Sequence, residues 1–344
     1  MRQIDALLLK EGIRRDAHLD YICAMLDEDY RVIATGSCFG NTLRCFAVDS
    51  AHQGEGLLNE IVTHLLEVQH ERGNRDLFLY TKIASAKFFK DLGFYEIARV
   101  EDTLVFMENR RGGFDKYLES LIWETEDSKA YELAEVAARG RKLRIGAIVM
   151  NANPFTLGHL YLVEKACAEC DLLHLFVVSE DASEVPFAVR RELVRKGTEH
   201  LTNIIYHDSG PYIISSATFP SYFLKDEETV VKGQAALDIE VFKRIAAALS
   251  IDARYVGEEP LSETTAIYNE VMKEGLGEAG IECVIVPRLR SGEAGAAAAA
   301  AGEAGDVISA SRVRQLMADG DLNALKSLVP QATYEYIANN KRQG

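Results

Sequence analysis

Hydrophobic and polar positions alternate over short distances in the first part of the chain. Strand-like segments flank Gly40-Asn41, a turn dipeptide that tolerates positive φ, so residues 31–48 are predicted to form a hairpin. Apolar residues then recur at helical spacing over 57–68. A further strand is predicted at 77–80 and a short helix through 88–89. The pattern predicts an α+β domain of short strands and helices.

From residue 143 onward the strand-like segments become almost wholly apolar. Residues 145–150 and 172–178 fit strands buried on both faces of a sheet, and a helical pattern over 158–168 separates them. That order is a βαβ unit and implies parallel pairing. Later strand and helix patterns alternate in the same way, at 187–200, 203–207, 238–249, 254–257, 262–274 and 281–287. The alternation predicts a doubly wound, Rossmann-like parallel sheet.

These patterns predict an α/β protein with two domains, which suits 344 residues at about 150 residues per domain. We place the α+β domain at 1–125, a charged helical linker at 126–142 and the parallel-sheet domain at 143–344. Residues 291–306, rich in Ala, Gly and Glu, are predicted to form a flexible insert in a loop.

Composition and charge narrow the classes of partner. A net charge of −15 argues against nucleic acid, whereas a small phosphorylated ligand needs only local positive charge. No apolar run is long enough to span a bilayer and no signal-peptide pattern opens the chain, so we expect a cytoplasmic protein without a membrane partner. Cys167 and Cys170 have CxxC spacing, but no second Cys or His pair completes a zinc site. We expect them to be packing residues with reduced thiols, and we expect no protein-held metal.

The segment Met150-Asn-Ala-Asn-Pro-Phe-Thr-Leu-Gly-His159 joins the first predicted strand of the second domain to its first helix. Open α/β sheets bind ligands at this edge. Gly158 lets the backbone approach a phosphate closely. His159, on the first helical turn, can donate a hydrogen bond where unpaired N–H groups and the helix dipole favour an anion. Taken alone, His159 is explained about equally well as a loop histidine that binds no ligand.

A second group of donors lies at 308–314, where Ser309, Ser311 and Arg314 surround the start of another predicted helix, with Ser311 as its predicted N-cap. The planar guanidinium of an arginine binds two phosphate oxygens at once. Taken alone, this segment is better explained as a well-capped surface helix. The chain contains no GxxxxGKS/T motif, so a P-loop enzyme is not expected.

Together the two segments resemble the T/HxGH and ISSTxxR-like signatures of the nucleotidyltransferase superfamily. Thr156 stands where the commoner form has histidine, as it does in phosphopantetheine adenylyltransferases. The resemblance implies that Thr156 and His159 stabilise the α-phosphate of ATP, while Ser309, Ser311 and Arg314 hold the β- and γ-phosphates. Further nucleotide-binding candidates are Asn153, Phe155, Gly158, Arg190 and Gly257. The choice of Arg190 over its neighbour stays open, and Gly257 could approach adenine or simply make a turn.

The first domain resembles the GNAT acetyltransferase fold. Gln53, Gly54 and Gly56 fit its Q/RxxGxG/A pyrophosphate loop, but Leu58 stands where Gly or Ala is usual. Residues 86–95 resemble a later GNAT element with a Gly-Phe turn. The resemblance implies a CoA-like ligand on this loop, and the alternative is a purely structural module.

The two domains in this order resemble the citrate (pro-3S)-lyase ligase family over nearly the whole chain. Asn151–His159, Ala217–Pro220 and Ile308–Arg314 carry the resemblance. It implies an AMP-forming acid–thiol ligase that uses ATP, with Mg²⁺ carried by the phosphates, and acetate. The acceptor would be the thiol of the CoA-like prosthetic group on the acyl carrier subunit of citrate lyase. Two alternatives remain: a nucleotidyltransferase that adenylates a phosphate ester such as a CoA or NAD precursor, and a GNAT acetyltransferase with a degenerate second domain.

Overall fold

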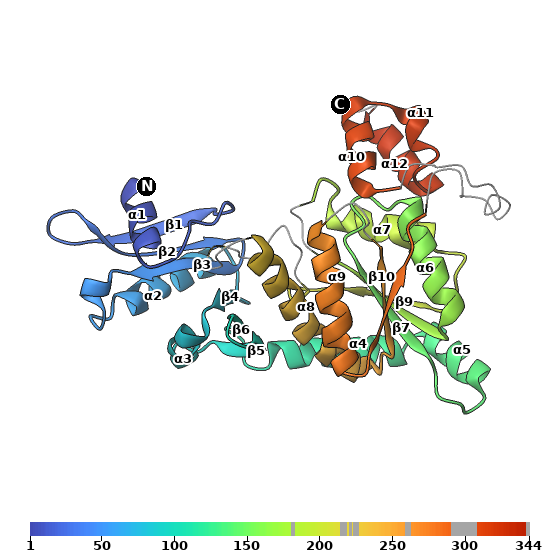
Figure 1. The fold of residues 1–344 in the computed structure, drawn as a ribbon, viewed down its shortest axis with the longest axis horizontal. Helices are drawn as coiled ribbons and strands as arrows, with labels where there is room; N and C mark the ends of the chain where they lie inside the picture. The colour runs from blue at the N-terminus through green and yellow to red at the C-terminus, as the bar shows by residue number, and fades with distance from the viewer. Residues whose placement is uncertain are drawn as a thin grey trace. The chain divides into compact units, whose positions relative to one another are not determined.

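The computed structural model describes residues 1–344 except 180–182, 214–218, 220–221, 223–226, 259–262, 290–307 and 342–344. Contacts divide the chain into two units (Figure 1): Met1–Lys116 with Thr218–Val241, and Tyr117–Ala217 with Phe242–Gly344. The predicted domain boundaries at 125 and 142 stay a prediction. The low-complexity stretch 291–306 lies outside the described residues, as do Ala217, Thr218 and Pro220.

The first unit is built on a six-stranded sheet with the order β1-β2-β3-β4-β6-β5. Only β3 and β4 pair in parallel; every other neighbouring pair is antiparallel. The predicted hairpin at 31–48 and the helix from residue 57 are confirmed, and so is the α+β character of this unit. Its elements are α1 (Arg2–Lys10), β1 (Tyr21–Leu26), β2 (Val32–Phe39), β3 (Thr42–Val48), η1 (Ser50–His52), α2 (Leu57–Glu71), β4 (Phe78–Thr81), α3 (Ile83–Asp91), β5 (Tyr95–Val100) and β6 (Leu104–Glu108).

Helix α2 is held tightly against this sheet. Its buried residues Ile61 and Leu65 pack into the core over β2, where a Cβ on Gly36 would lie 2.5 Å from Cγ2 of Ile61. The helix begins after Gly56, whose φ of +82° is in the left-handed region that glycine adopts without strain. This packing fixes the position of the predicted pyrophosphate loop before α2.

The second unit contains a five-stranded, fully parallel sheet with the order β11-β10-β7-β8-β9. The chain runs outward from β7 through β8 to β9, then returns to the other side of β7, so the doubly wound sheet is confirmed. Helices α4 (Gly113–Glu126) and α8 (Glu227–Leu249) each begin in the first unit and end in the second. The other elements of the second unit are α5 (Lys129–Ala138), β7 (Ile145–Met150), α6 (Leu157–Glu169), β8 (Leu172–Val177), α7 (Phe187–Gly197), β9 (Ile204–Asp208), β10 (Ala253–Gly257), α9 (Glu263–Glu278), β11 (Glu282–Val286), α10 (Ala310–Asp319), α11 (Leu322–Leu325) and α12 (Gln331–Lys341).

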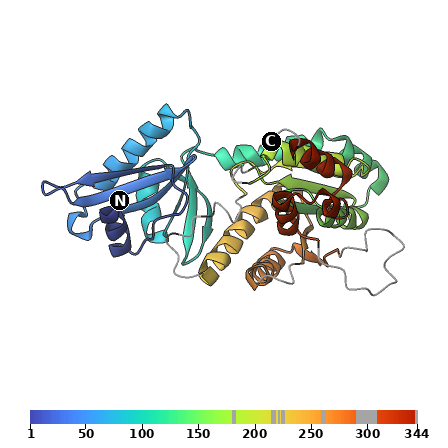
Figure 2. The same ribbon diagram turned by 90° about the horizontal axis from the view of Figure 1, so that it is seen from above.

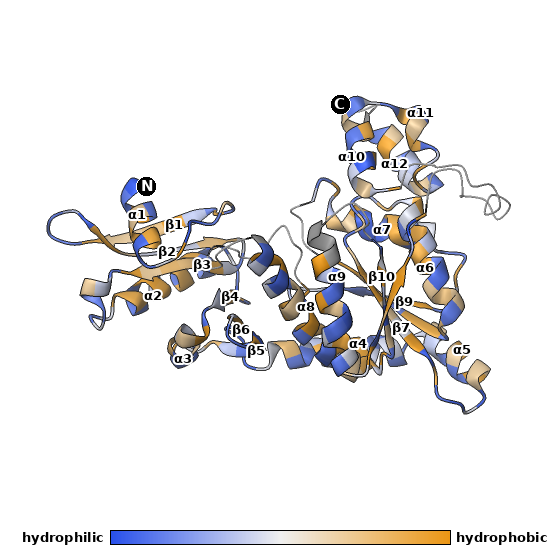
Figure 3. Ribbon diagram, in the orientation of Figure 1, coloured by the Kyte–Doolittle hydropathy of each residue, from blue (hydrophilic) through white to orange (hydrophobic). Residues whose placement is uncertain are grey.

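Hydrophobic burial explains this arrangement. The strands of the parallel sheet are mostly hydrophobic (Figure 3), and β7 and β8 are buried on both faces as predicted. Cys167 and Cys170 are buried in the same core, which confirms their packing role. Helix α12 packs against α7, next to the parallel sheet (Figure 2). Among the described residues, no helix is long and apolar enough to cross a membrane.

Candidate functional site

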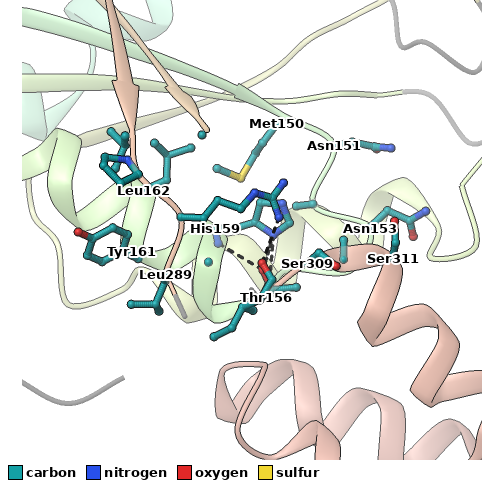
Figure 4. A pocket seen from close by; sticks show the side chains of 18 of the residues that line it. Met150, Asn151, Asn153, Thr156, His159, Tyr161, Leu162, Leu289, Ser309 and Ser311 are labelled. Carbon is teal, nitrogen blue, oxygen red and sulfur yellow. Dashed lines mark hydrogen bonds between the residues drawn. The ribbon is translucent and has the colours of Figure 1, made fainter. Parts of the chain in front are cut away.

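A cavity of about 340 Å³ lies at the carboxyl end of β7, within the size range of small-molecule sites. Because the strand order reverses around β7, this edge is the switch point where open α/β sheets bind ligands. Figure 4 shows the convergence of the loop after β7, the first turn of α6 and the start of α10 on this cavity. The predicted site residues that line it are Asn153, Thr156, Gly158, His159, Gly257, Ser309, Ser311 and Arg314.

Thr156 and His159 form the N-terminal cap of α6. Oγ1 of Thr156 accepts the backbone N–H of His159 at 3.3 Å, and the backbone N–H of Thr156 donates to Nδ1 of His159 at 3.1 Å (Figure 4). Two helix-end donors are thereby satisfied by side chains. The T-x-G-H spacing thus builds a reciprocal cap as well as a motif on the cavity wall.

This cap also sets the protonation state of His159. A backbone N–H can only donate, so Nδ1 must be unprotonated and a neutral ring carries its proton on Nε2. Burial, and secondly the positive charge of Arg288, lower the pKa of His159 to about 4. His159 is therefore neutral near pH 7 and offers one Nε2–H donor.

Gly158 brings the two signature segments together. A Cβ at this position would lie 3.2 Å from the carbonyl oxygen of Ile308, which is tighter than ordinary contact. The missing side chain lets the backbone leading into α10 pass directly over the first turn of α6. Its observed role is close backbone packing, while approach to a phosphate stays a prediction.

Helix α10 begins two residues earlier than predicted. Ser309, and not Ser311, is its N-cap, because Oγ of Ser309 accepts the backbone N–H of Arg312 at 3.2 Å. Ser311 lies within the helix and is exposed, and its Oγ accepts a hydrogen bond from Nη2 of Arg314 at 3.0 Å. The prediction of Ser311 as N-cap was wrong, since Ser309 has the extended backbone of a cap residue.

Arg314 joins the two segments a second time. Its Nη1 donates to the carbonyl oxygen of Asn153 at 2.7 Å, and its Nε lies 3.8 Å from a carboxylate oxygen of Glu184. The Asn153 side chain is occupied in turn, because its Oδ1 accepts the backbone N–H of Val185 at 3.0 Å. The guanidinium thus reaches the cavity from α10 while anchored to the loop after β7.

Two of the predicted nucleotide-binding residues do not line the cavity. Phe155 is fully buried and its ring stacks on that of His159, with centroids 5.9 Å apart. Arg190 is also fully buried, which excludes the alternative of a solvated helix arginine. Its guanidinium donates to the carbonyl oxygens of Val185, Asn151 and Val178 at 2.7–2.9 Å. Both residues brace the loops behind the cavity, so direct contact with a nucleotide has no support from the geometry.

Arg288, which the sequence patterns did not single out, lines the cavity just after β11. Its Nε donates to the carbonyl oxygen of Glu258 at 2.6 Å, and its Nη1 to that of Ile308 at 3.1 Å. One available signal was its place directly after a predicted strand, at the sheet edge where the other candidate site residues follow their strands. Gly257 lies at the same edge, and an added Cβ there would meet nothing within 4 Å.

The loop of Gln53, Gly54 and Gly56 belongs to the first unit. Gly54 and Gly56 have φ of +89° and +82°, a Cβ added at either would meet nothing within 4 Å, and no side chain caps the start of α2. Leu58 lines a separate cavity of only about 80 Å³, well below the usual size of a ligand site. The buried hydroxyl of Tyr222 donates to the carbonyl oxygen of Tyr80 beside this cavity at 3.3 Å.

Possible metal ligands are not clustered in the part of the chain that the structure describes. It contains no group of three or more His, Cys, Asp or Glu side chains that could hold an ion. The charged groups on the cavity wall are the guanidinium groups of Arg288 and Arg314. The cavity is therefore suited to an anion even though the whole chain is acidic.

Comparison with known proteins agrees with the two signatures. Residues 145–337 match the family described as the citrate lyase ligase C-terminal domain. The chain is 38% identical over 348 residues to a citrate (pro-3S)-lyase ligase from Klebsiella pneumoniae, covering 96% of this chain and 94% of that protein. It is 39% identical over 345 residues to the Escherichia coli K12 protein of the same name, covering 98% and 90%. An acetyltransferase structure from Bacillus cereus aligns with 31% of this chain and 86% of its own, at 19% identity and a TM-score of 0.24.

Proposed function

The chain belongs to the citrate lyase ligase family, and we propose that it is an ATP-dependent ligase that acetylates citrate lyase. We place the acceptor thiol on the CoA-like prosthetic group of the acyl carrier subunit, with acetate as the acyl donor and AMP and diphosphate as products. The observation that carries this proposal is one cavity lined by His159 together with Ser309 and Arg314. Two anion-binding helix starts facing one space suit a triphosphate.

The chemistry requires activation of a poor acyl donor. A carboxylate does not transfer its acyl group to a thiol, because an oxide leaving group would have to depart. Attack of the acetate oxygen on the α-phosphate releases diphosphate and forms acetyl adenylate. The thiolate then attacks the carbonyl carbon and AMP leaves. Among the described residues that line the cavity, Thr156 has a hydroxyl next to an imidazole, as an acyl-enzyme nucleophile would need. This hydroxyl is buried, however, and accepts the hydrogen bond of a helix N–H. We therefore expect a noncovalent adenylate and no acyl-enzyme.

The residues on the cavity wall supply positioning and charge stabilisation. Nε2–H of His159 donates to an oxygen of the α-phosphate, where negative charge grows during displacement. Thr156 holds the imidazole in the required tautomer through its backbone N–H. Ser309, Ser311 and Arg314 bind the β- and γ-phosphates, with the N-terminus of α10 favouring the same charge. Mg²⁺ would be held mainly by the phosphates, since none of the described residues on this wall carries a carboxylate.

The first unit is proposed to hold the CoA-like arm. The uncapped start of α2, with two positive-φ glycines before it, offers backbone N–H groups to a pyrophosphate. Binding of dephospho-CoA to the full chain, with and without Gly54→Val, tests this part. Equal, weak binding by both proteins would leave this unit a structural module.

Reactivation of thiol-form citrate lyase tests the overall reaction. We expect activity to return on incubation with this protein, ATP, Mg²⁺ and acetate, with AMP formed in step with acetylated carrier. Omitting acetate or ATP should abolish the gain. Accumulation of ADP would indicate an acyl-phosphate route, and reactivation by acetyl-CoA alone would favour the GNAT alternative.

A further inference from the structure

Arg288 occupies a central position among the elements that build the cavity. It follows β11 and its guanidinium bonds to carbonyl oxygens on two other segments, Glu258 after β10 at 2.6 Å and Ile308 before α10 at 3.1 Å. The Ile308 carbonyl is also the atom that Gly158 leaves room for. One arginine therefore connects the carboxyl end of the sheet to the backbone at the start of the second signature.

We propose that Arg288 is a positioning residue for adenylation: it holds the Ile308 carbonyl so that Ser309 to Arg314 face His159, and it keeps a permanent positive charge beside the imidazole. A planar guanidinium, with several donors in fixed geometry, can bond to two carbonyl oxygens at once, whereas the single ammonium group of a flexible lysine side chain cannot. This inference rests on the proposed adenylation and extends it to a residue outside both signatures.

The charge of Arg288 has a specific effect on His159. Besides burial, Arg288 contributes to the low pKa of His159. The other titratable or charged side chains on the described cavity wall are Tyr161 and Arg314. A protonated His159 would carry a proton on Nδ1 and lose the hydrogen bond from the Thr156 N–H. By disfavouring that proton, Arg288 preserves both the cap of α6 and the Nε2–H donor.

Two substitutions separate the effect of the two guanidinium hydrogen bonds from the effect of the positive charge. Arg288→Gln removes both, and Arg288→Lys keeps the charge but cannot span the two carbonyls. We expect kcat/KM for ATP in acetate-dependent exchange to fall by about 10- to 100-fold in both variants, the size of one charge-assisted hydrogen bond. Arg195→Gln is the control, since Arg195 is exposed on α7 and does not line the cavity.

An NMR titration of the His159 imidazole gives a readout that a purely structural role would not move. The midpoint should move to higher pH in Arg288→Gln and stay near the wild-type value in Arg288→Lys. An unchanged midpoint in Arg288→Gln, or wild-type kcat/KM in either variant, would overturn the proposal. If Arg288→Gln does not fold, the kinetics of Arg288→Lys decide, with loss supporting the role and wild-type kinetics refuting it. If the wild-type protein itself shows no exchange, the proposed function fails, whereas the titration still tests Arg288.

Discussion

Replacing His159 should separate an observed role from a proposed one, at opposite edges of its imidazole ring. Nδ1 accepts the Thr156 N–H at 3.1 Å and caps α6, while Nε2–H is the donor that we propose for the α-phosphate. His159→Ala removes both. His159→Asn keeps an acceptor at the capping position, because the amide oxygen of Asn is a good mimic of Nδ1, but it has no donor at the position of Nε2.

The expected magnitudes follow from these contacts. Loss of one preorganised donor at the α-phosphate lowers the adenylation rate by about 100- to 1,000-fold. Loss of the cap leaves one helix-end N–H without its side-chain acceptor and lowers the free energy of unfolding by about 1 kcal/mol. His159→Ala should therefore show both losses. His159→Asn should recover most of the stability and none of the rate.

Exchange kinetics and urea denaturation of the same preparations measure the two effects. His200→Ala is the matched control, because His200 is exposed and pairs with Glu164 away from the cavity. Near-normal exchange by His159→Ala would remove His159 from the reaction. A fall in rate that merely followed the fall in stability across the variants would show that the cap alone matters.

Further substitutions test the rest of the site. Arg314→Lys should raise the KM for ATP clearly, because lysine keeps the charge without the two-pronged geometry, and unchanged kinetics would remove Arg314 from the site. Gly158→Ala should lower the free energy of unfolding in urea by about 1–3 kcal/mol and weaken ATP binding, because its Cβ would lie too close to the Ile308 carbonyl oxygen. Wild-type stability would show that the backbone at Ile308 can move away without cost. Arg190→Met should lower unfolding free energy by several kcal/mol, because buried carbonyl groups lose their donor at about 1–3 kcal/mol each; a loss of ATP affinity without a stability change would instead favour ligand contact. Burial, then the nearby His207, lower the pKa of His174 to about 3. The unfolded chain therefore takes up this proton at higher pH than the folded one, and the free energy of unfolding should fall as pH drops below about 6.5, by up to about 1.4 kcal/mol per pH unit. Urea titrations of His174→Gln should show a shallower fall.

The periodicity of apolar residues was sufficient to predict strands and helices where one burial pattern continues over many residues. The buried runs at 145–150 and 172–178, with a helical pattern between them, gave the parallel sheet and the ligand-binding edge. Strands β1, β5 and β6 were not predicted. Strand β1 is only half buried, β5 is exposed at its first two residues, and β6 is five residues long and buried on both faces, so none shows a clear alternation.

The candidate site could be predicted from the sequence only where residue type and motif also determine which way the side chain points. Thr156 and His159 come from one short motif on a helix start, and the structure places them together. Arg190 carries an equally suitable group, but it points into the protein, which spacing along α7 could not reveal. Ser309 and Ser311 are equivalent caps by composition, and only the backbone conformation distinguishes them. Arg288 joins the site through bonds to residues about 20 and 30 positions away in sequence, a relation that no local pattern contains.

The central claim is that the cavity at the end of β7 adenylates a carboxylate. Exchange of labelled diphosphate into ATP, measured with and without acetate, tests it most directly because it needs neither the carrier nor the thiol. We predict exchange that depends on acetate, saturates with it and is lost in His159→Ala. Exchange that proceeds equally without acetate, or that requires a phosphate ester in its place, would contradict this account and favour a nucleotidyltransferase of a different substrate class.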